Sequence, residues 1–193
     1  MRFPLLFWVA TMPAFAAMPG WWTAFTRMPA MESRFRQESD SAVFGKLSRQ
    51  GRLALARGGH LKVSYDGGLT ITCDGRQLVQ YDPDTRTAQR MDLARAVRDF
   101  PLLSLLLDPA RVDRLYRIDV FGGETVRLTP REAGLPDLKA TGRKGLLHTL
   151  EWTDPTGARQ KLELLDPRAP AALPPDFFHP KVPAGTRWST PNG

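Results

Sequence analysis

The chain has 193 residues, a length that fits one domain and can bury one sizeable core. Its formal net charge is +7, but its 27 basic residues are spread along the chain instead of being clustered. This spread argues against a nucleic-acid-binding face and favours a solvated surface of mixed charge or an anionic partner. The single cysteine, Cys73, excludes an internal disulfide, and we expect it to be a small core residue of a strand.

Residues 1–17 are typical of a secretory signal peptide. The second residue is arginine, and an apolar run then continues to Phe15 and the small residues Ala16 and Ala17. The run is too short to span a bilayer well. We expect cleavage after Ala16 or Ala17, leaving one domain over residues 18–193 in an oxidising compartment. No cysteine follows the cleavage site, so no lipid anchor is expected there.

A short helix is expected at the start of the mature chain, where apolar side chains recur at helical spacing until a proline ends the pattern. Strands follow, separated by Gly-Gly and Asp-Gly pairs that supply the positive φ of tight hairpin turns. The helix residues are Trp21, Trp22, Phe25 and Met28, and the expected strands cover residues 31–37, 46–57, 60–66, 69–74, 77–82 and 88–93.

Between residues 93 and 108 the pattern becomes helical. Leu93, Val97 and Phe100 recur at helical spacing, and Pro101 suits the first turn of a second helix. That second helix is apolar on nearly every side, so it must be buried on nearly every side. Its leucines are Leu102, Leu103, Leu105, Leu106 and Leu107.

Strands return after this insert, over residues 115–121, 124–129, 138–143, 146–153 and 159–165. A proline-rich tail that begins at Pro167 is expected to wrap around the body as extended chain. About ten or eleven antiparallel strands with one apolar helical insert predict a mainly β fold. We expect a curled antiparallel sheet, forming a half-open β-barrel, with the helix as a lid over an apolar cavity.

The lining of this cavity follows from matching alternation in three consecutive strands, because side chains of one parity share a face. Arg57 has the parity of the apolar residues, and an inward-facing arginine needs hydrogen-bond acceptors. Carbonyls at the end of the 102–108 helix could accept; alternatively, Arg57 ends an edge strand and turns into water. The lining residues are Leu53, Leu55, Leu61, Val63, Tyr65, Leu69 and Ile71, with Leu102, Leu103, Leu105 and Leu106 from the lid.

Six segments of the chain carry a resemblance to a known family. They are Phe35-Arg36-Gln37, the run 51–57, Asp74-Gly75 with the run 78–83, Val126-Arg127-Leu128-Thr129-Pro130, Asp154-Pro155-Thr156-Gly157, and the run 177–185. In order and spacing they resemble motifs of the outer-membrane lipoprotein carrier protein LolA family of Gram-negative bacteria, over roughly residues 30–188. Where the family has proline after its arginine, this chain has Gly58-Gly59, and Val79 replaces the family's tryptophan.

The resemblance implies a periplasmic carrier that shields lipoprotein acyl chains. Such a carrier takes its cargo from an inner-membrane lipoprotein-releasing ABC transporter and passes it to an outer-membrane receptor. The family arginine corresponds to Arg57, which would latch the lid through hydrogen bonds to lid carbonyls. We expect a monomer with no cofactor, no metal, no nucleic acid and no catalytic residue.

Two alternatives remain open. The chain could be a LolA-like lipid- or glycolipid-binding protein of a specialised export system, or a periplasmic sensor domain on the same half-barrel. An enzyme is less favoured, because His60, His148 and His179 are scattered without metal-ligand spacing and no hydrolase motif occurs. The related outer-membrane receptor is also less favoured, since it needs a lipid-anchored cysteine.

Overall fold

The computed structural model describes residues 17–99 and 102–189, so the predicted signal peptide lies almost entirely outside it. No helix in this part of the chain is long and apolar enough to cross a membrane. In chain order the elements are α1 (Gly20–Arg27), β1 (Ala30–Ser41), β2 (Gly45–Ala56), β3 (His60–Tyr65), β4 (Thr70–Asp74), β5 (Gln77–Asp82), β6 (Thr87–Asp92), α2 (Leu93–Asp99), α3 (Leu102–Leu107), the 3-10 helix η1 (Pro109–Arg114), β7 (Tyr116–Val120), β8 (Thr125–Pro130), β9 (Leu138–Arg143), β10 (Leu146–Thr153), β11 (Arg159–Arg168), the 3-10 helix η2 (Pro175–Phe178) and β12 (Arg187–Ser189).

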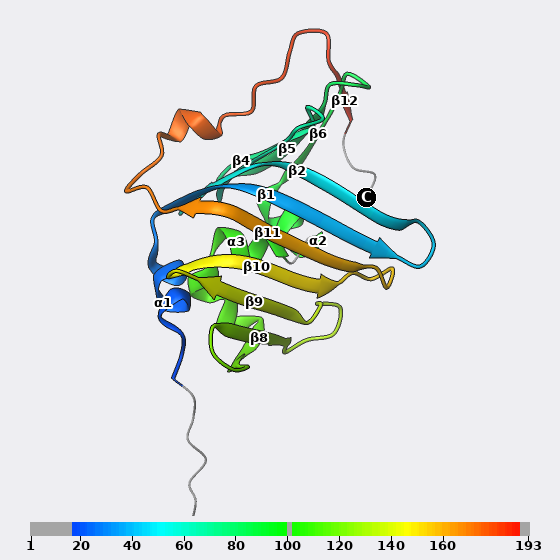
Figure 1. Ribbon diagram of the computed structural model, residues 1–193. Coiled ribbons are helices and arrows are strands. Elements are labelled where there is room, and N and C mark those ends of the chain that lie inside the picture. Colours follow the sequence, from blue (N-terminus) through cyan, green and yellow to red (C-terminus); the bar gives the residue numbers. More distant parts are fainter. Residues whose placement is uncertain (1–16, 100–101, 190–193) are drawn as a thin grey trace, which may run out of the picture.

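The strands form one sheet in the order β12-β6-β5-β4-β3-β2-β1-β11-β10-β9-β8-β7. Neighbours are antiparallel except β12 and β6, which are parallel. The strands at the two ends of this order are not paired with each other, so the sheet is not closed. In Figure 1 the strands β8 to β11 face the viewer and β4 to β6 turn away behind them. The mainly β, half-open barrel expected from the sequence is therefore confirmed.

The two faces of this sheet differ in polarity. Phe35 on β1 and Leu53 on β2 are buried, whereas their neighbours Arg34 and Arg52 are exposed on the opposite face. We call the face that carries Phe35 and Leu53 the inner face, and it holds the core. Its strand residues include Met31, Phe35, Leu53, Leu55, Leu61, Cys73, Tyr116, Val126, Leu128, Leu138, Ala140, Leu150, Leu162 and Leu164.

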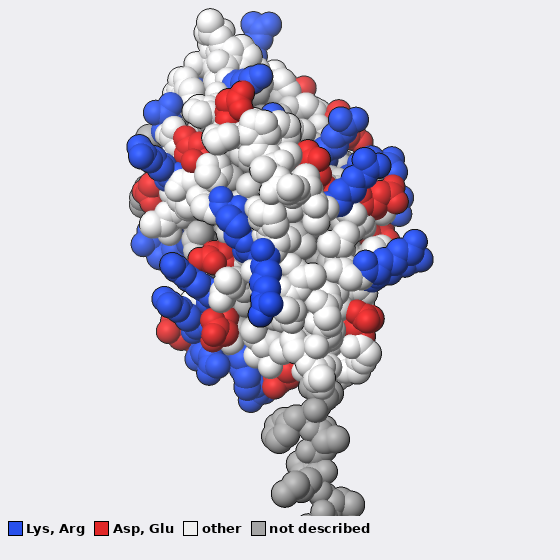
Figure 2. All heavy atoms as spheres, turned by 90° about the vertical axis from the view of Figure 1, so that its left-hand side faces the viewer, with Lys and Arg blue, Asp and Glu red and all other residues white. Residues whose placement is uncertain are grey.

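Cys73 is a free, fully buried thiol in this core, as the sequence predicts. Burial raises its pKa, which keeps the thiol protonated and unreactive at neutral pH. The charged residues lie outside the core. Figure 2 shows Lys and Arg interspersed with Asp and Glu over one side of the molecule, which matches the mixed-charge surface expected from the composition.

Helix α1 packs against β9, β10 and η1. Its aromatic stripe predicts core contact, and Trp21, Trp22 and Phe25 are all buried in the core. The Trp21 indole Nε1 donates a hydrogen bond to the Glu124 carbonyl at 2.8 Å. Gly142 on β9 makes room for the indole, since a Cβ at that position would collide with the Trp21 ring. Helix α1 is thus fixed to the β8–β10 side of the barrel.

The C-terminal tail is expected to wrap around the body, and in the structure it follows the outer face of the sheet. Helix η2 contacts β3 and β4, and Phe178 is 1% exposed there. Lys62 on β3 donates a hydrogen bond to the Phe177 carbonyl at 3.3 Å, and its ammonium lies 4.4 Å from the Phe177 ring centre. Strand β12, which the sequence pattern does not indicate, then pairs with β6 at the edge of the sheet.

Candidate functional site

The lining residues that the sequence predicts on β2 and β3 lie together on the inner face. Leu53 is paired with Val63, and Leu55 with Leu61, so these side chains are direct neighbours across the two strands. The three leucines are at most 5% exposed. Val63 and Tyr65 are half-buried and pack against the same core. Together they form a continuous apolar patch.

Leu69 and Ile71 lie further toward the edge of the sheet. Ile71 on β4 is paired with Val63 and shares its face. Leu69 precedes β4, and its carbonyl accepts a hydrogen bond from the Tyr65 amide at 2.9 Å. Both side chains are half-exposed. They border the apolar patch and are not part of the buried core.

Helix α3 covers part of this patch. It contacts β2, η1 and α2, while α2 contacts β5 and β6. Leu105, Leu106 and Leu107 are at most 5% exposed, and Leu102 and Leu103 pack against the same core with part of their surface exposed. The leucine-rich helix therefore lies on the inner face, and its buried side shields part of the apolar patch from solvent.

Arg57 follows β2 and is half-buried. Its Nε donates a hydrogen bond to the Met28 carbonyl at 2.8 Å, and one terminal nitrogen donates to the Phe25 carbonyl at 2.9 Å. These carbonyls belong to the C-terminal end of α1, where backbone acceptors lack helical partners. Burial lowers the pKa of Arg57, and the negative charge of Asp108 partly opposes this effect. The guanidinium remains charged at neutral pH.

The acceptors of Arg57 differ from the expected ones. The sequence predicts acceptors at the end of the 102–108 helix, whereas in the structure the acceptors lie at the end of α1. Asp108, directly after α3, is near enough to act on Arg57 through its charge, but its own ion pair is with Arg111 at 3.4 Å. Strand parity indicates that Arg57 is on the same face as Leu53 and Leu55, but it does not indicate which helix end lies next to Arg57. The sequence alone therefore could not distinguish the end of α1 from the end of α3.

The inner-face residues of strands β7 to β11 are not among the site residues predicted from the sequence. Strands β7 to β11 contribute Tyr116, Leu128, Leu138 and Leu150, all at most 1% exposed. The alternation of apolar and polar residues in 115–129 and 146–153 carries the signal for these lining residues, because side chains of one parity share a face.

Two tyrosines add polar groups to this interior. The Tyr65 hydroxyl donates a hydrogen bond to the Gln37 side-chain oxygen at 3.1 Å, and burial raises the pKa of Tyr65. The Tyr116 hydroxyl is buried without a hydrogen-bond partner among the described residues. Burial, helped by the charge of Asp137, raises the pKa of Tyr116 to about 12. Both hydroxyls therefore stay neutral, as an apolar interior requires.

Residues 17–99 and 102–189 hold no group of three or more His, Cys, Asp and Glu side chains that could bind a metal ion. The prominent chemistry of the inner face is apolar contact. A surface of buried leucines, a helix laid over it and one charged group at its margin can bind an apolar chain and exclude water from it.

The model of the family described as outer membrane lipoprotein carrier protein LolA matches residues 27–181. A search of curated proteins finds no match. Among solved structures, the chain is similar to an uncharacterized conserved protein from Thermus thermophilus, with 10% identity, 88% of this chain and 97% of that chain covered, and a TM-score of 0.53.

Two further solved structures are similar. One is a LolA superfamily protein from Nitrosomonas europaea, with 11% identity, 80% and 91% of the two chains covered, and a TM-score of 0.46. The other is a putative outer membrane lipoprotein-sorting protein domain from Vibrio parahaemolyticus, with 12% identity, 81% and 92% covered, and a TM-score of 0.46. Because the family model spans most of the described chain, the protein belongs to the LolA family of outer membrane lipoprotein carrier proteins.

Proposed function

We propose that this protein is a periplasmic carrier that holds lipoprotein acyl chains between the inner face of the sheet and helix α3. The contact of α3 with the inner face carries the proposal. Leu105 and Leu106 are buried in the same core as Leu53 and Leu55 of β2. An acyl chain requires the same apolar, water-free surroundings, so it can take the place of the helix.

The energies of this exchange are of similar size. Exposing a fully buried leucine costs about 1.5–3 kcal/mol, so withdrawing Leu105, Leu106 and Leu107 costs about 5–9 kcal/mol. An acyl chain gains about 0.8 kcal/mol per buried methylene, so about 6–11 buried methylenes offset that cost. One membrane-lipid acyl chain is long enough to supply them. The empty carrier would therefore be closed, and loading would open it reversibly.

Arg57 is proposed to favour the closed state. Its two hydrogen bonds to α1 hold the guanidinium in place beside the end of α3. There the negative charge of Asp108 attracts it. Movement of α3 away from the inner face would carry Asp108 with it and weaken this attraction. Arg57 would thus latch the lid through charge, using α1 as its support.

The membership of the chain in the LolA family supports the remaining steps. An inner-membrane lipoprotein-releasing ABC transporter would load the carrier, and an outer-membrane receptor would unload it. The carrier would act as a monomer and would not be an enzyme. Mass spectrometry of material co-purified from the native periplasm tests the cargo. Acylated lipoprotein is expected, and a different lipid would point to a specialised export system.

Binding of an environment-sensitive fluorescent fatty acid tests the site. Val63→Glu places a charge on the half-buried part of the inner face and should weaken binding roughly tenfold or more. Val43→Glu is the matched control, because Val43 lies in the turn between β1 and β2 and is 81% exposed. Unchanged binding in a folded Val63→Glu variant would place the apolar ligand elsewhere.

A further inference from the structure

The outer face of the sheet carries a groove that the carrier function does not use. It lies between strands β11, β1, β2 and β3 and the tail residue Phe177, and has a volume of about 700 Å³. We call it the outer groove. It is lined by Glu32, Ser33, Arg34, Arg52, Leu53, Ala54, Lys62, Ser64, Leu165, Asp166, Arg168 and Phe177.

Basic side chains outnumber acidic ones in the outer groove. Arg34 on β1 and Arg52 on β2 are directly opposite each other and point to the same face. Like charges at directly opposed positions destabilise a sheet, and strands lie only about 4.8 Å apart. Arg52 makes no hydrogen bond or ion pair with the described residues. The fold therefore keeps two guanidinium groups side by side with only one of them paired.

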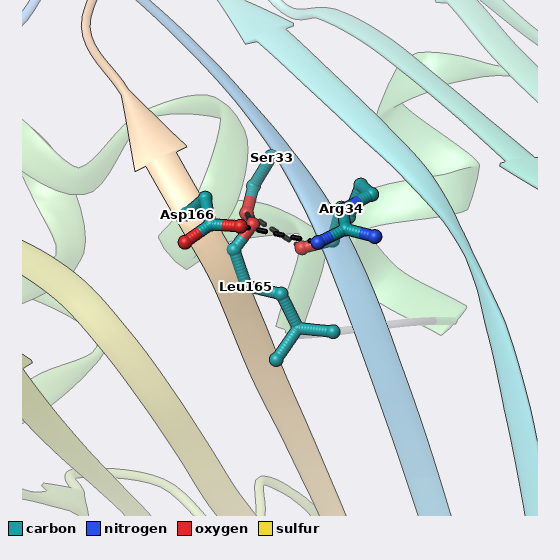
Figure 3. Close-up of polar contacts among 4 residues, drawn as sticks. All are labelled: Ser33, Arg34, Leu165 and Asp166. Carbon is teal, nitrogen blue, oxygen red and sulfur yellow. Dashed lines mark hydrogen bonds and ion pairs between the residues drawn. The ribbon is translucent and has the colours of Figure 1, made fainter.

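The pairing of Arg34 is weak and easily exchanged. One of its terminal nitrogens lies 3.1 Å from the Asp166 carboxylate, and the two side chains are 66% and 77% exposed. Figure 3 shows them reaching toward each other from β1 and the end of β11, beside the bond from the Ser33 hydroxyl to the Leu165 carbonyl. Exposed pairs of this kind contribute little, so another carboxylate can displace Asp166.

Lys62 and Phe177 form the opposite wall. Lys62 lies one strand beyond Arg52, where its ammonium contacts the Phe177 ring and carbonyl. The tail thus fixes a third cation and an aromatic surface close to the two arginines. Anionic groups would meet the guanidinium groups, and an adjoining apolar side chain would meet Phe177.

We propose that the outer groove binds an acidic peptide segment of a partner protein. Planar guanidinium groups suit carboxylates, which they can hold through two parallel hydrogen bonds. The groove is recessed between the sheet and the tail, so a narrow extended chain can enter it more readily than a flat bilayer surface. It also lies on the face opposite α3. A partner could therefore dock there whether or not the inner face holds cargo.

Fluorescence anisotropy with a labelled peptide of alternating Glu and Ser tests the proposal in low salt, with a Gln-Ser peptide as the uncharged probe. Arg34→Gln combined with Arg52→Gln should weaken binding of the acidic peptide roughly tenfold or more. Arg143→Gln combined with Arg187→Gln removes the same charge from exposed positions elsewhere and should change affinity about twofold or less. Asp166→Asn removes the competing carboxylate and should tighten binding; asparagine tolerates the φ of +55° at this position.

Three results would overturn the proposal. The first is equal weakening by the two double variants, which would mean that net charge alone attracts the peptide. The second is the absence of binding to the acidic peptide by the wild-type protein. The third is binding to vesicles of anionic lipid that depends on Arg34 and Arg52 and that the acidic peptide does not compete away, which would assign the groove to a membrane surface. None of these readouts depends on acyl-chain binding, so the carrier proposal is tested separately.

Discussion

Replacing Arg57 by leucine removes the link between the end of β2 and the end of α1. Two charge-assisted hydrogen bonds, to Met28 and Phe25, are lost. Bonds of this type contribute about 1.5–3 kcal/mol each, and both together about 3–6 kcal/mol. Arg57 is only half-buried, so water satisfies part of what the carbonyls lose. We therefore expect the free energy of unfolding to fall by about 2–4 kcal/mol.

Chemical denaturation measures this loss, and hydrogen exchange locates it. In Arg57→Leu the amides of α1 should lose protection because their helix end is no longer held. If Arg57 also latches the lid, the α3 amides of the empty protein should lose protection as well. Arg57→Lys should show part of both effects, because a point charge replaces the planar fork.

Arg52→Leu is the matched control. It removes the same charge from β2, the strand that Arg57 follows, but Arg52 is exposed and bonds to none of the described residues. The effect of Arg52→Leu on the free energy of unfolding should therefore stay within about 0.5 kcal/mol. Equal α3 protection in wild type and Arg57→Leu would refute the latch. Equal stability of Arg57→Leu and Arg52→Leu would refute the whole account of the α1 bonds.

Three further predictions concern the core and one turn. Gly142→Ala should lower the free energy of unfolding, measured in urea, by about 3 kcal/mol, because the new methyl group displaces the Trp21 ring. Gly20→Ala is the control and should be neutral or stabilising, because no atom lies close to the position of its new methyl group. Tyr116 has a pKa raised to about 12 by burial, so the folded state holds its proton more tightly than the unfolded chain. The free energy of unfolding should therefore fall between pH about 10 and 12, and Tyr116→Phe should reduce that fall. The same variant should raise the free energy of unfolding at neutral pH by up to about 1 kcal/mol, because it removes an unpaired buried hydroxyl. A fall of the same size in Tyr116→Phe and wild type would contradict this. Asp154→Ala should cost about 1 kcal/mol at neutral pH by loosening the β10–β11 turn, because the Thr156 hydroxyl and amide bond its carboxylate and lower its pKa. The stability that the Asp154 carboxylate contributes should disappear as the pH falls below about 4, because the carboxylate is then protonated. A stability difference between wild type and Asp154→Ala that persists at lower pH would contradict this prediction.

Local chemistry explains which parts of the fold could be predicted. The hairpin between β2 and β3 follows from Gly58 and Gly59, which both adopt positive φ. The apolar helix α3 follows from a run of leucines that has to be buried. Both signals lie within a few residues of the structure that they predict.

Contacts between distant segments could not be predicted in the same way. Strand β12 has only three residues and is created by its pairing with β6, which no local pattern announces. Parity assigns Arg57 to the face of the apolar β2 residues, yet its partners lie 29 and 32 residues away at the end of α1. The outer groove combines β1, β2, β3, β11 and the tail, so no single stretch of sequence contains it.

The central seam of the sheet joins β1 to β11, and across it Arg34 meets a residue 132 positions later in the chain. During synthesis, the edge of β1 that pairs with β11 therefore has no partner strand until the β11 segment has been synthesised. Until then β1 is an open edge with a row of unpaired backbone groups, which invites pairing with other chains. Contacts of such long range also slow folding. A chain shortened before residue 159 should consequently aggregate instead of forming a smaller barrel.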